Sequence, residues 1–318
     1  MHNLLVSILR PLLEFIYWIV PNYGWAVVLF TVAIRALLLP LDIKSRRSMK
    51  RMSDLKPQLD ALSAKYANDK EKLQRKTAEL YRKEKINPMS GCLPLLIQFP
   101  LLFGMLWTMQ AIAAEHMVEM IQTLEAGGQP VMQSWLWVKN VFCPDTLYAA
   151  VIPIARDLHS LQATANVTQE AVNAARAFVT NAQLYNPIMV EYGATVVKGI
   201  GDLMRSGTLP AWELLQVLNN PNGYYILPLL AAGTQFLQTK LNPAESGQTG
   251  PNGKPGGMAM FMKYFFPLMS LWICCTSSAA FSIYWLTANV IAILQSIFLN
   301  KYFEKKDAKA KAAQGDIR

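Results

Sequence analysis

Long apolar runs alternate with charged segments along this chain. Apolar residues continue almost unbroken from Trp25 to Leu41, from Leu93 to Ala114 and from Tyr224 to Leu241. A membrane-spanning helix needs about 20 apolar residues, so these runs are of spanning or near-spanning length. The nearly uncharged stretch from Tyr264 to Leu299 has 36 residues, too many for one span, and the small polar group Thr276–Ser278 predicts a turn inside it. The pattern therefore predicts an all-α polytopic membrane protein with five transmembrane helices.

The first twenty residues have a different periodicity. Polar residues recur every three or four positions and predict a polar stripe on a helix whose other faces are apolar. Pro21 ends this pattern, and no small-residue cleavage site follows, which is untypical of a signal peptide. We expect an amphipathic helix in the interface of the outer leaflet, with a cleaved signal segment as the alternative. The polar stripe is Asn3, Ser7, Arg10, Glu14 and Tyr17.

The charged segment after the first apolar run predicts a helical hairpin. Apolar residues follow helical 3-3-4-3-4 spacing from Met49 to Tyr66, and Asn68 and Asp69 then interrupt the pattern. A weaker, densely charged helical pattern follows. Pro57 is expected to bend the first helix. The alternative is a solvated charged loop.

Composition agrees with a membrane protein. Hydrophobic residues make up 53% of the chain and charged residues 16%, and the mean hydropathy is +0.20. One soluble core of this length would not need so much apolar surface.

The charges between the apolar runs predict the orientation. The segment from Asp42 to Ser90 has 14 Lys or Arg against 7 Asp or Glu, whereas the segment from Glu115 to Gly223 has 5 against 9. Because Lys and Arg collect in cytoplasmic loops, the first segment is expected inside and the second outside. The tail after Leu299 has six basic and three acidic residues and is expected inside. Five spans then place the N-terminus outside, and the net charge of +9 reflects topology rather than nucleic-acid binding.

Polar residues inside the predicted spans suggest a wet cavity. Arg35 is a charge within an apolar run, which costs about 2.5–3.5 kcal/mol on insertion scales. Gln98 and Gln235 lie at a depth close to that of Arg35, about 8–9 Å from the inner surface by helical rise. Asn289 adds an amide to the last span. Snorkelling of Arg35 toward Asp42, and amides that only join helices, are the alternatives.

Motifs for covalent chemistry are missing from the sequence. It contains no phosphate-binding Gly-rich loop, no His-Glu-x-x-His and no Gly-x-Ser-x-Gly, and its three histidines are scattered. The four cysteines have no metal-site spacing. We therefore expect neither an enzyme nor a metal or cofactor site.

Several separated motifs resemble the YidC/Oxa1/Alb3 family of membrane protein insertases. They run in the family's order and cover most of the chain, from about Pro21 to Lys301. They comprise Gly24-Trp25 with Thr31 to Arg35 and Pro40-Leu41, the charged hairpin, the segment Asn87 to Pro100, the segment Gly223 to Pro228, and Tyr284-Trp285 with Asn289.

The resemblance implies a five-helix core around a hydrophilic groove that is open to cytoplasm and lipid and closed to the outside. It implies that the protein resides in the bacterial cytoplasmic membrane and that its clients are nascent membrane proteins. The implied partners are the ribosome, the signal-recognition-particle receptor, the Sec translocon and membrane lipids. The family arginine matches Arg35, and Thr31 and Tyr284 match positions that face a passing client. The expected groove residues are Thr31, Arg35, Gln98, Gln235, Tyr284, Trp285 and Asn289, and the expected recruitment residues of the hairpin are Lys65, Asp69, Lys70 and Lys72.

The chain departs from the family pattern in three ways. We expect a Gram-positive-like form without the large soluble domain that Gram-negative members carry before the core. The basic tail is short, and the external segment is about 110 residues long. A small-solute transporter or channel and a non-inserting assembly scaffold remain as alternatives, although the repeated halves common in transporters are not found. The expected divisions are 1–20 (interfacial helix), 21–41 (first span), 42–92 (cytoplasmic hairpin), 93–114 (second span), 115–223 (external, mostly helical insert), 224–241 (third span), 242–260 (cytoplasmic loop), 261–300 (fourth and fifth spans) and 301–318 (basic cytoplasmic tail).

Overall fold

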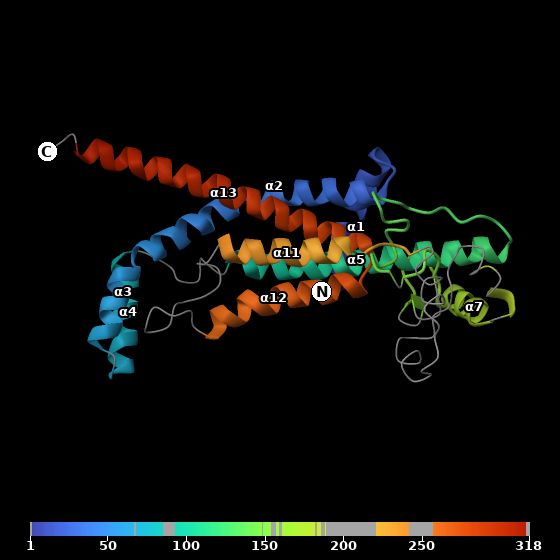
Figure 1. Cartoon of the computed structure of the whole chain (residues 1–318), viewed down its shortest axis with the longest axis horizontal. Coiled ribbons are helices and arrows are strands. Elements are labelled where there is room, and N and C mark those ends of the chain that lie inside the picture. Colours follow the sequence, from blue (N-terminus) through green and yellow to red (C-terminus); the bar gives the residue numbers. More distant parts are fainter. Residues whose placement is uncertain are drawn as a thin grey trace, which may run out of the picture. The chain divides into compact units, whose positions relative to one another are not determined.

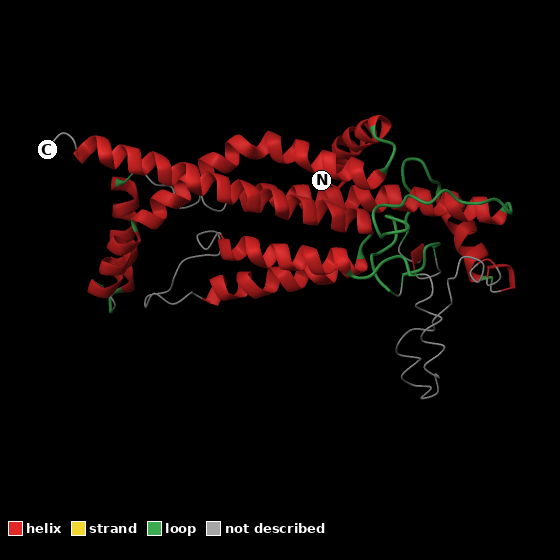
Figure 2. Ribbon diagram, turned by 45° about the horizontal axis from the view of Figure 1, so that its top comes forward, coloured by secondary structure: helices red, strands yellow, loops and turns green. Residues whose placement is uncertain are grey.

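The computed structural model is mostly helical in the part of the chain that it describes (Figure 1). The described residues are 2–66, 68–84, 93–147, 149–153, 157–158, 161–181, 183–185, 188, 221–241 and 257–315. Within them no strand forms, and one isolated bridge pairs Trp135 with Val138. Figure 2 shows the helices in red, joined by irregular loops in green.

Helix α1 (His2–Ile19) is amphipathic, as its periodicity predicts. Large apolar side chains, including Leu4, Ile8 and Trp18, are exposed along it, whereas Leu9 and Leu13 are buried. Two residues of the polar stripe contact other parts of the protein, whereas Ser7 is exposed. Arg10 forms an ion pair with Glu115 of α5, and the Tyr17 hydroxyl accepts a hydrogen bond from Gln133.

Helix α2 (Tyr23–Asp54) is longer than the predicted first span. It continues past Leu41 through the basic cluster without a break, because a change from apolar to charged side chains does not interrupt backbone hydrogen bonding. The helix ends just before Pro57, which occupies the first turn of α3 (Lys56–Lys65). Pro57 therefore separates two helices instead of bending one, since its ring clashes with the carbonyl four residues earlier.

Helices α3 and α4 (Lys70–Lys83) lie side by side (Figure 1). The Asp69 side chain caps α4 by accepting a hydrogen bond from the Lys72 backbone N–H at 3.0 Å, as expected for an Asp before a helix. The two helices have 10 and 14 residues. Residues 85–92 of the predicted hairpin lie outside the described residues.

Helix α5 (Leu93–Glu125) extends 11 residues beyond the predicted end of the second span at Ala114. Its last turns form a small apolar core with α7 (Gln169–Thr180), a helix of the insert. The Thr168 hydroxyl caps α7 by accepting from the Ala171 N–H at 3.2 Å. This part of the insert therefore packs on α5 rather than forming a core of its own. The core includes Val118, Ile121, Leu124, Ile152, Leu158, Val172, Ala175 and Val179.

Three further helices complete the described chain: α11 (Ile226–Leu241), α12 (Gly257–Thr276) and α13 (Ala279–Gly315). The break between α12 and α13 falls at the small polar residues where the sequence predicts a turn. Three helical segments of the described chain are long and apolar enough to cross a membrane, namely Tyr23–Met52, Gln98–Glu125 and Ala279–Lys305. Helix α11 has 16 residues, fewer than the usual span.

The chain divides into two compact units with different interiors. Unit 1 comprises Met1–Thr31, Leu101–Ala231 and Leu271–Leu286, and unit 2 comprises Val32–Pro100, Ala232–Ser270 and Thr287–Arg318. Among the described residues, the twelve largest fully buried side chains all belong to unit 1. Eleven of them are wholly apolar, such as Phe30, Met105 and Ile283, and the twelfth is Tyr284. The buried side chains of unit 2 include Ser45, Ser270, Asn289 and Ser296.

Candidate substrate-binding region

Arg35 lies on the shielded face of α2. Thr31, Arg35, Asp42 and Ser45 recur at helical spacing, and none of these side chains is exposed, whereas Val32 and Leu37 are exposed on the other side of the helix. Arg35 and Asp42 interact electrostatically. The Arg35 side chain is half-buried and makes no hydrogen bond or ion pair with another described residue. The guanidinium, which carries five N–H donors, thus lies on the shielded face of α2.

Helix α11 also turns its polar residues inward. Thr234, Gln235 and Gln238 are half-buried along one stripe, while Phe236 and Leu237 are exposed. The Asn289 side-chain amide of α13 donates to the Thr234 hydroxyl at 3.3 Å. This hydrogen bond brings the predicted residues Gln235 and Asn289 into one polar region between α11 and α13.

The same polar stripe of α13 reaches α2. The Arg46 guanidinium donates to the buried Ser296 hydroxyl at 2.8 Å, and the Lys50 ammonium lies 6.0 Å from the centre of the Phe303 ring. The opposite side of α13 is apolar and exposed, with Leu294 and Phe298 on its surface. Polar contacts thus join α2, α11 and α13 inside unit 2.

Gln98 is half-buried near the start of α5, where the rings of Phe99 and Phe266 lie 6.3 Å apart and join α5 to α12. Two buried polar atoms of unit 2, the Gln238 Oε1 and the Ser270 Oγ, have no hydrogen-bond partner among the described residues. A buried polar group without a partner costs about 1–3 kcal/mol, so these atoms favour water or a polar ligand beside them.

The remaining expected groove residues, Thr31, Tyr284 and Trp285, belong to unit 1, and all three side chains are buried. The Thr31 hydroxyl donates to the Val27 carbonyl of its own helix at 2.7 Å. The Phe281 ring lies 6.0 Å from the Tyr284 ring and 5.6 Å from the Trp285 ring. These residues form part of a tightly packed apolar core, and the structure does not present them on a surface.

The expected recruitment residues gather at the turn between α3 and α4. The Lys65 and Lys72 ammonium groups lie 5.7 and 5.8 Å from the centre of the Tyr66 ring. Asp69 is used as the α4 cap, and Lys70 begins that helix. Two cations beside an aromatic ring form a small positive surface with an apolar centre.

Sequence reasoning missed a buried polar clamp in unit 1. The Asp145 carboxylate accepts hydrogen bonds from the Tyr224 N–H at 2.7 Å and the Leu227 N–H at 2.6 Å, and so caps α11. The Asn222 side chain donates to the carbonyls of Asn140 and Pro144, each at 2.9 Å. A Cβ atom on Gly223 would overlap the Asp145 carboxylate. The Asn222–Gly223 pair is a local turn signal, but nothing local indicates a partner 79 positions away.

The same loop also supports the start of α13. The Ala279 N–H donates to the Cys143 carbonyl at 2.9 Å and the Ala280 N–H donates to the Val141 carbonyl at 2.8 Å. These bonds satisfy N–H groups that have no partner within the helix. The segment 140–146 thus fixes the starts of two helices at once.

The arrangement supplies polar groups for binding and solvation. Its polar groups are amides, hydroxyls and guanidinium groups, which can replace water around a polar segment inside an apolar environment. Among the described residues, no group of three His, Cys, Asp or Glu side chains could hold a metal ion.

The sequence profile of the family described as "60Kd inner membrane protein" matches residues 15–200 and 200–307 of this chain. Similar proteins carry the name "Membrane protein insertase YidC". One from Polynucleobacter asymbioticus is 28% identical over 298 residues, which cover 94% of this chain and 36% of that protein. One from Fusobacterium nucleatum is 27% identical over 300 residues, which cover 94% of this chain and 97% of that protein.

A relative from Anaeromyxobacter is 39% identical over 149 residues, which cover 46% of this chain and 24% of that protein. The chain spans little more than a third of the Polynucleobacter asymbioticus protein and 37% of a relative from Laribacter hongkongensis. Because the family profile covers most of its length, the chain belongs to the 60Kd inner membrane protein family, the family of the YidC/Oxa1 insertases.

Proposed function

We propose that the chain is a membrane protein insertase of the bacterial cytoplasmic membrane, which moves polar parts of nascent membrane proteins through unit 2. One observation carries this proposal: polar side chains occupy the shielded stripes of α2, α11 and α13 while large apolar side chains are exposed. A water-soluble helix has the reverse arrangement. An apolar exterior suits lipid, and a polar interior suits a client segment that must leave water.

The proposed groove is formed by Arg35, Gln98, Gln235 and Asn289. A guanidinium in a partly desolvated site attracts the acidic or polar tail of an incoming span, because charge interactions strengthen as water is removed. The amides give the tail hydrogen bonds in place of water. Thr31, Tyr284 and Trp285 stay in the proposal on the strength of the resemblance alone, since their side chains are buried.

The proposed membrane arrangement has five spans, with the N-terminus outside and the C-terminus inside. Exposed apolar side chains on α11 and α12, such as Leu229 and Leu268, support lipid contact by these helices as well as by the three long candidates. The charge difference between the segments 42–90 and 115–223 supports the orientation. Helix α1, with its exposed apolar stripe, is proposed to lie in the outer interface.

The proposed clients are nascent membrane proteins, and the proposed partners are the ribosome, the signal-recognition-particle receptor and the Sec translocon. The turn between α3 and α4, with Lys65, Asp69, Lys70 and Lys72, is the proposed site of recruitment. The cations around Tyr66 support contact with an acidic surface.

Site-specific photo-crosslinking to a stalled nascent chain tests the proposal. A crosslinker placed at Gln98, Gln235 or Asn289 should react with a nascent membrane segment, whereas one at Val172 in the insert core should not. Equal reaction at Val172, or none at the three groove positions, would exclude unit 2 as the path. Uptake of a small solute with no nascent-chain crosslink would instead favour a transporter.

A further inference from the structure

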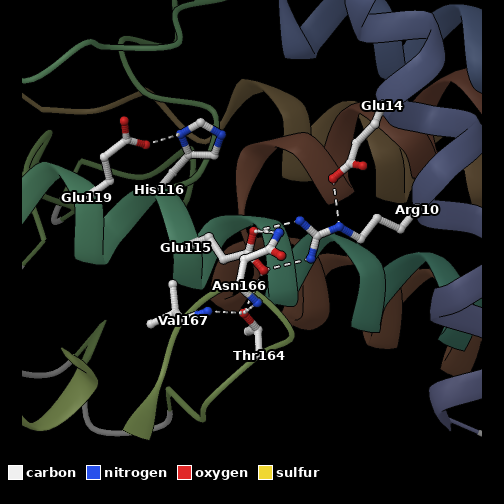
Figure 3. A network of polar contacts seen from close by, with 8 residues as sticks. All are labelled: Arg10, Glu14, Glu115, His116, Glu119, Thr164, Asn166 and Val167. Carbon is white, nitrogen blue, oxygen red and sulfur yellow. Dashed lines mark hydrogen bonds and ion pairs between the residues drawn. The ribbon is translucent and has the colours of Figure 1, made fainter. Parts of the chain in front are cut away.

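Helix α1 is held against α5 by apolar contact and by one ion pair. Leu9 and Leu13 of α1 are buried, and an added Cβ atom on Gly104 of α5 would lie 3.3 Å from the Leu5 Cβ. The Arg10 guanidinium binds both oxygens of the Glu115 carboxylate, with each distance 2.6 Å (Figure 3). Only 14% of the Arg10 side chain and 15% of the Glu115 side chain is exposed. The pair is therefore shielded from water, and its strength depends on keeping the two parallel hydrogen bonds between the guanidinium and the carboxylate.

The insert supplies two further hydrogen bonds to the same carboxylate. The Thr164 hydroxyl donates to Glu115 Oε1 at 2.6 Å, and the Asn166 side-chain amide donates to Oε2 at 3.1 Å. Figure 3 shows both side chains approaching Glu115 from the loop that precedes α7, while Arg10 approaches from α1. Glu115 thus receives donors from two segments that are distant in sequence.

The loop is built so that the Thr164 hydrogen points at Glu115. The hydroxyl oxygen accepts hydrogen bonds from the N–H groups of Asn166 and Val167, each at 3.2 Å. The Thr164 backbone N–H donates to the Val167 carbonyl at 2.9 Å and closes the loop. With both acceptor positions used, the single hydroxyl hydrogen remains for the carboxylate.

Arg10 is oriented from its other side as well. Its Nε donates to Glu14 one turn further along α1 at 2.6 Å. The guanidinium fork is then fixed in the plane that meets the Glu115 carboxylate with two bonds. A shift of the carboxylate would lose that two-bond geometry.

We propose that the insert loop 164–167 is a positioning element for α1: Thr164 and Asn166 hold the Glu115 carboxylate in the orientation that grips Arg10, and so set how α1 docks on α5. The inference concerns docking alone and does not depend on the proposed insertase function.

A cysteine pair measures the docking directly. In Leu5→Cys with Gly104→Cys the two Cβ atoms are close enough for a disulfide. The protein is placed in nanodiscs of phosphatidylethanolamine and phosphatidylglycerol and titrated with reduced and oxidised glutathione. The equilibrium gives the effective concentration of the two introduced thiols relative to each other, which falls when α1 docks less firmly on α5. The disulfide is identified by mass spectrometry of the linked peptides, so the native cysteines can stay.

The double change Thr164→Val with Asn166→Ala should lower this effective concentration about fivefold. A change of this size is typical of the coupling between residues that share one hydrogen-bond network. In an Arg10→Ala background the same double change should have no further effect, since the grip is already lost. The matched control is Thr180→Val with Asn181→Ala. Within the described part of the chain, the side chains of these exposed residues bond only within or next to α7, so the control should leave the effective concentration unchanged.

Two outcomes would overturn the inference. If the double change lowers the effective concentration equally in the native and in the Arg10→Ala background, Thr164 and Asn166 act on the fold and not through the ion pair. If it has no effect with Arg10 present, the loop does not position α1. Arg10→Lys should retain part of the docking, because an ammonium keeps the charge and loses the two-bond geometry.

Discussion

At the residue scale, the position of a polar side chain on its helix decides its role more than its type does. Arg35 and Asn289 both lie on shielded stripes, within the polar interior of unit 2. Asp145 is also fully buried, but its carboxylate is occupied by backbone donors of α11. The Asp145 carboxylate therefore holds the fold, whereas Arg35 and Asn289 belong to the proposed groove.

Arg35→Ala should impair insertion of clients with negatively charged external tails more than that of other clients. Arg35→Lys should retain much of the activity, because the proposed role uses charge more than fork geometry. Insertion measured by protease protection of matched clients with acidic and neutral tails checks both expectations. Normal insertion of every client by both variants would leave Arg35 as a residue that only snorkels toward Asp42.

Asp145→Ala should lower the free energy of unfolding by about 1–3 kcal/mol, because it leaves the buried Leu227 N–H and the partly buried Tyr224 N–H without their acceptor. Thermal unfolding in detergent measures the change, and Asp60→Ala on an exposed face of α3 is the matched control. Gly223→Ala should have an effect of similar size, since its Cβ atom would displace the same carboxylate. Full additivity of the two changes would contradict a shared clamp.

At the element scale, several helices continue beyond the segment that would lie in a membrane. Helix α13 has 37 residues, about 55 Å at 1.5 Å per residue, whereas the hydrocarbon core is about 30 Å thick. Helix α2 likewise continues from its apolar part through the basic cluster to Asp54.

Shortening the turn by deleting residues 68–72 should reduce crosslinking of clients to the groove without changing the abundance of the protein. The deletion removes the Asp69 cap and two of the cations but leaves α2, α11 and α13 unchanged. Crosslinking from Asn289, normalised to protein level, is the measurement. Unchanged crosslinking would show that this turn does not take part in recruitment.

At the scale of the whole molecule, the two units differ in what they bury. Unit 1 has a dense apolar core with two buried polar networks, whereas the interior of unit 2 is rich in hydroxyls and amides. A dense apolar core excludes water, and an interior rich in hydrogen-bonding side chains favours it.

Replacing Gln98, Gln235 and Asn289 together by Leu should therefore stall clients in contact with unit 2, while their first crosslinks at the turn between α3 and α4 stay intact. The substitutions remove hydrogen bonds that replace water around a polar tail. A time course of crosslinking checks the order of events. Stalling at the same point as the 68–72 deletion would mean that recruitment and movement are one step.

The proposed orientation can be tested with single cysteines in intact cells. A membrane-impermeant maleimide should label a cysteine at Gln169 and fail to label one at Asp69 or Gln314, because the charge bias places these residues on opposite sides. Permeabilised cells supply the control for reactivity. External labelling at Asp69 would reverse the whole arrangement.

The sequence by itself determined the helical class, the family and the polar positions within the apolar runs. Each of these follows from local periodicity or from motifs, which survive without knowledge of the fold. It also located the break at Thr276–Ser278, since a turn signal depends on neighbouring residues.

Only the tertiary structure decided which distant residues meet. Asp145 and Leu227 are 82 positions apart, and Arg10 and Glu115 are 105 positions apart, so no local pattern could pair them. The sequence predicts the same polar stripe on α1 whether that stripe faces water or protein, and the structure turns Arg10 of that stripe toward Glu115. Packing also placed Thr31 and Tyr284 in the core of unit 1, because burial depends on all neighbouring helices and not on the periodicity of one.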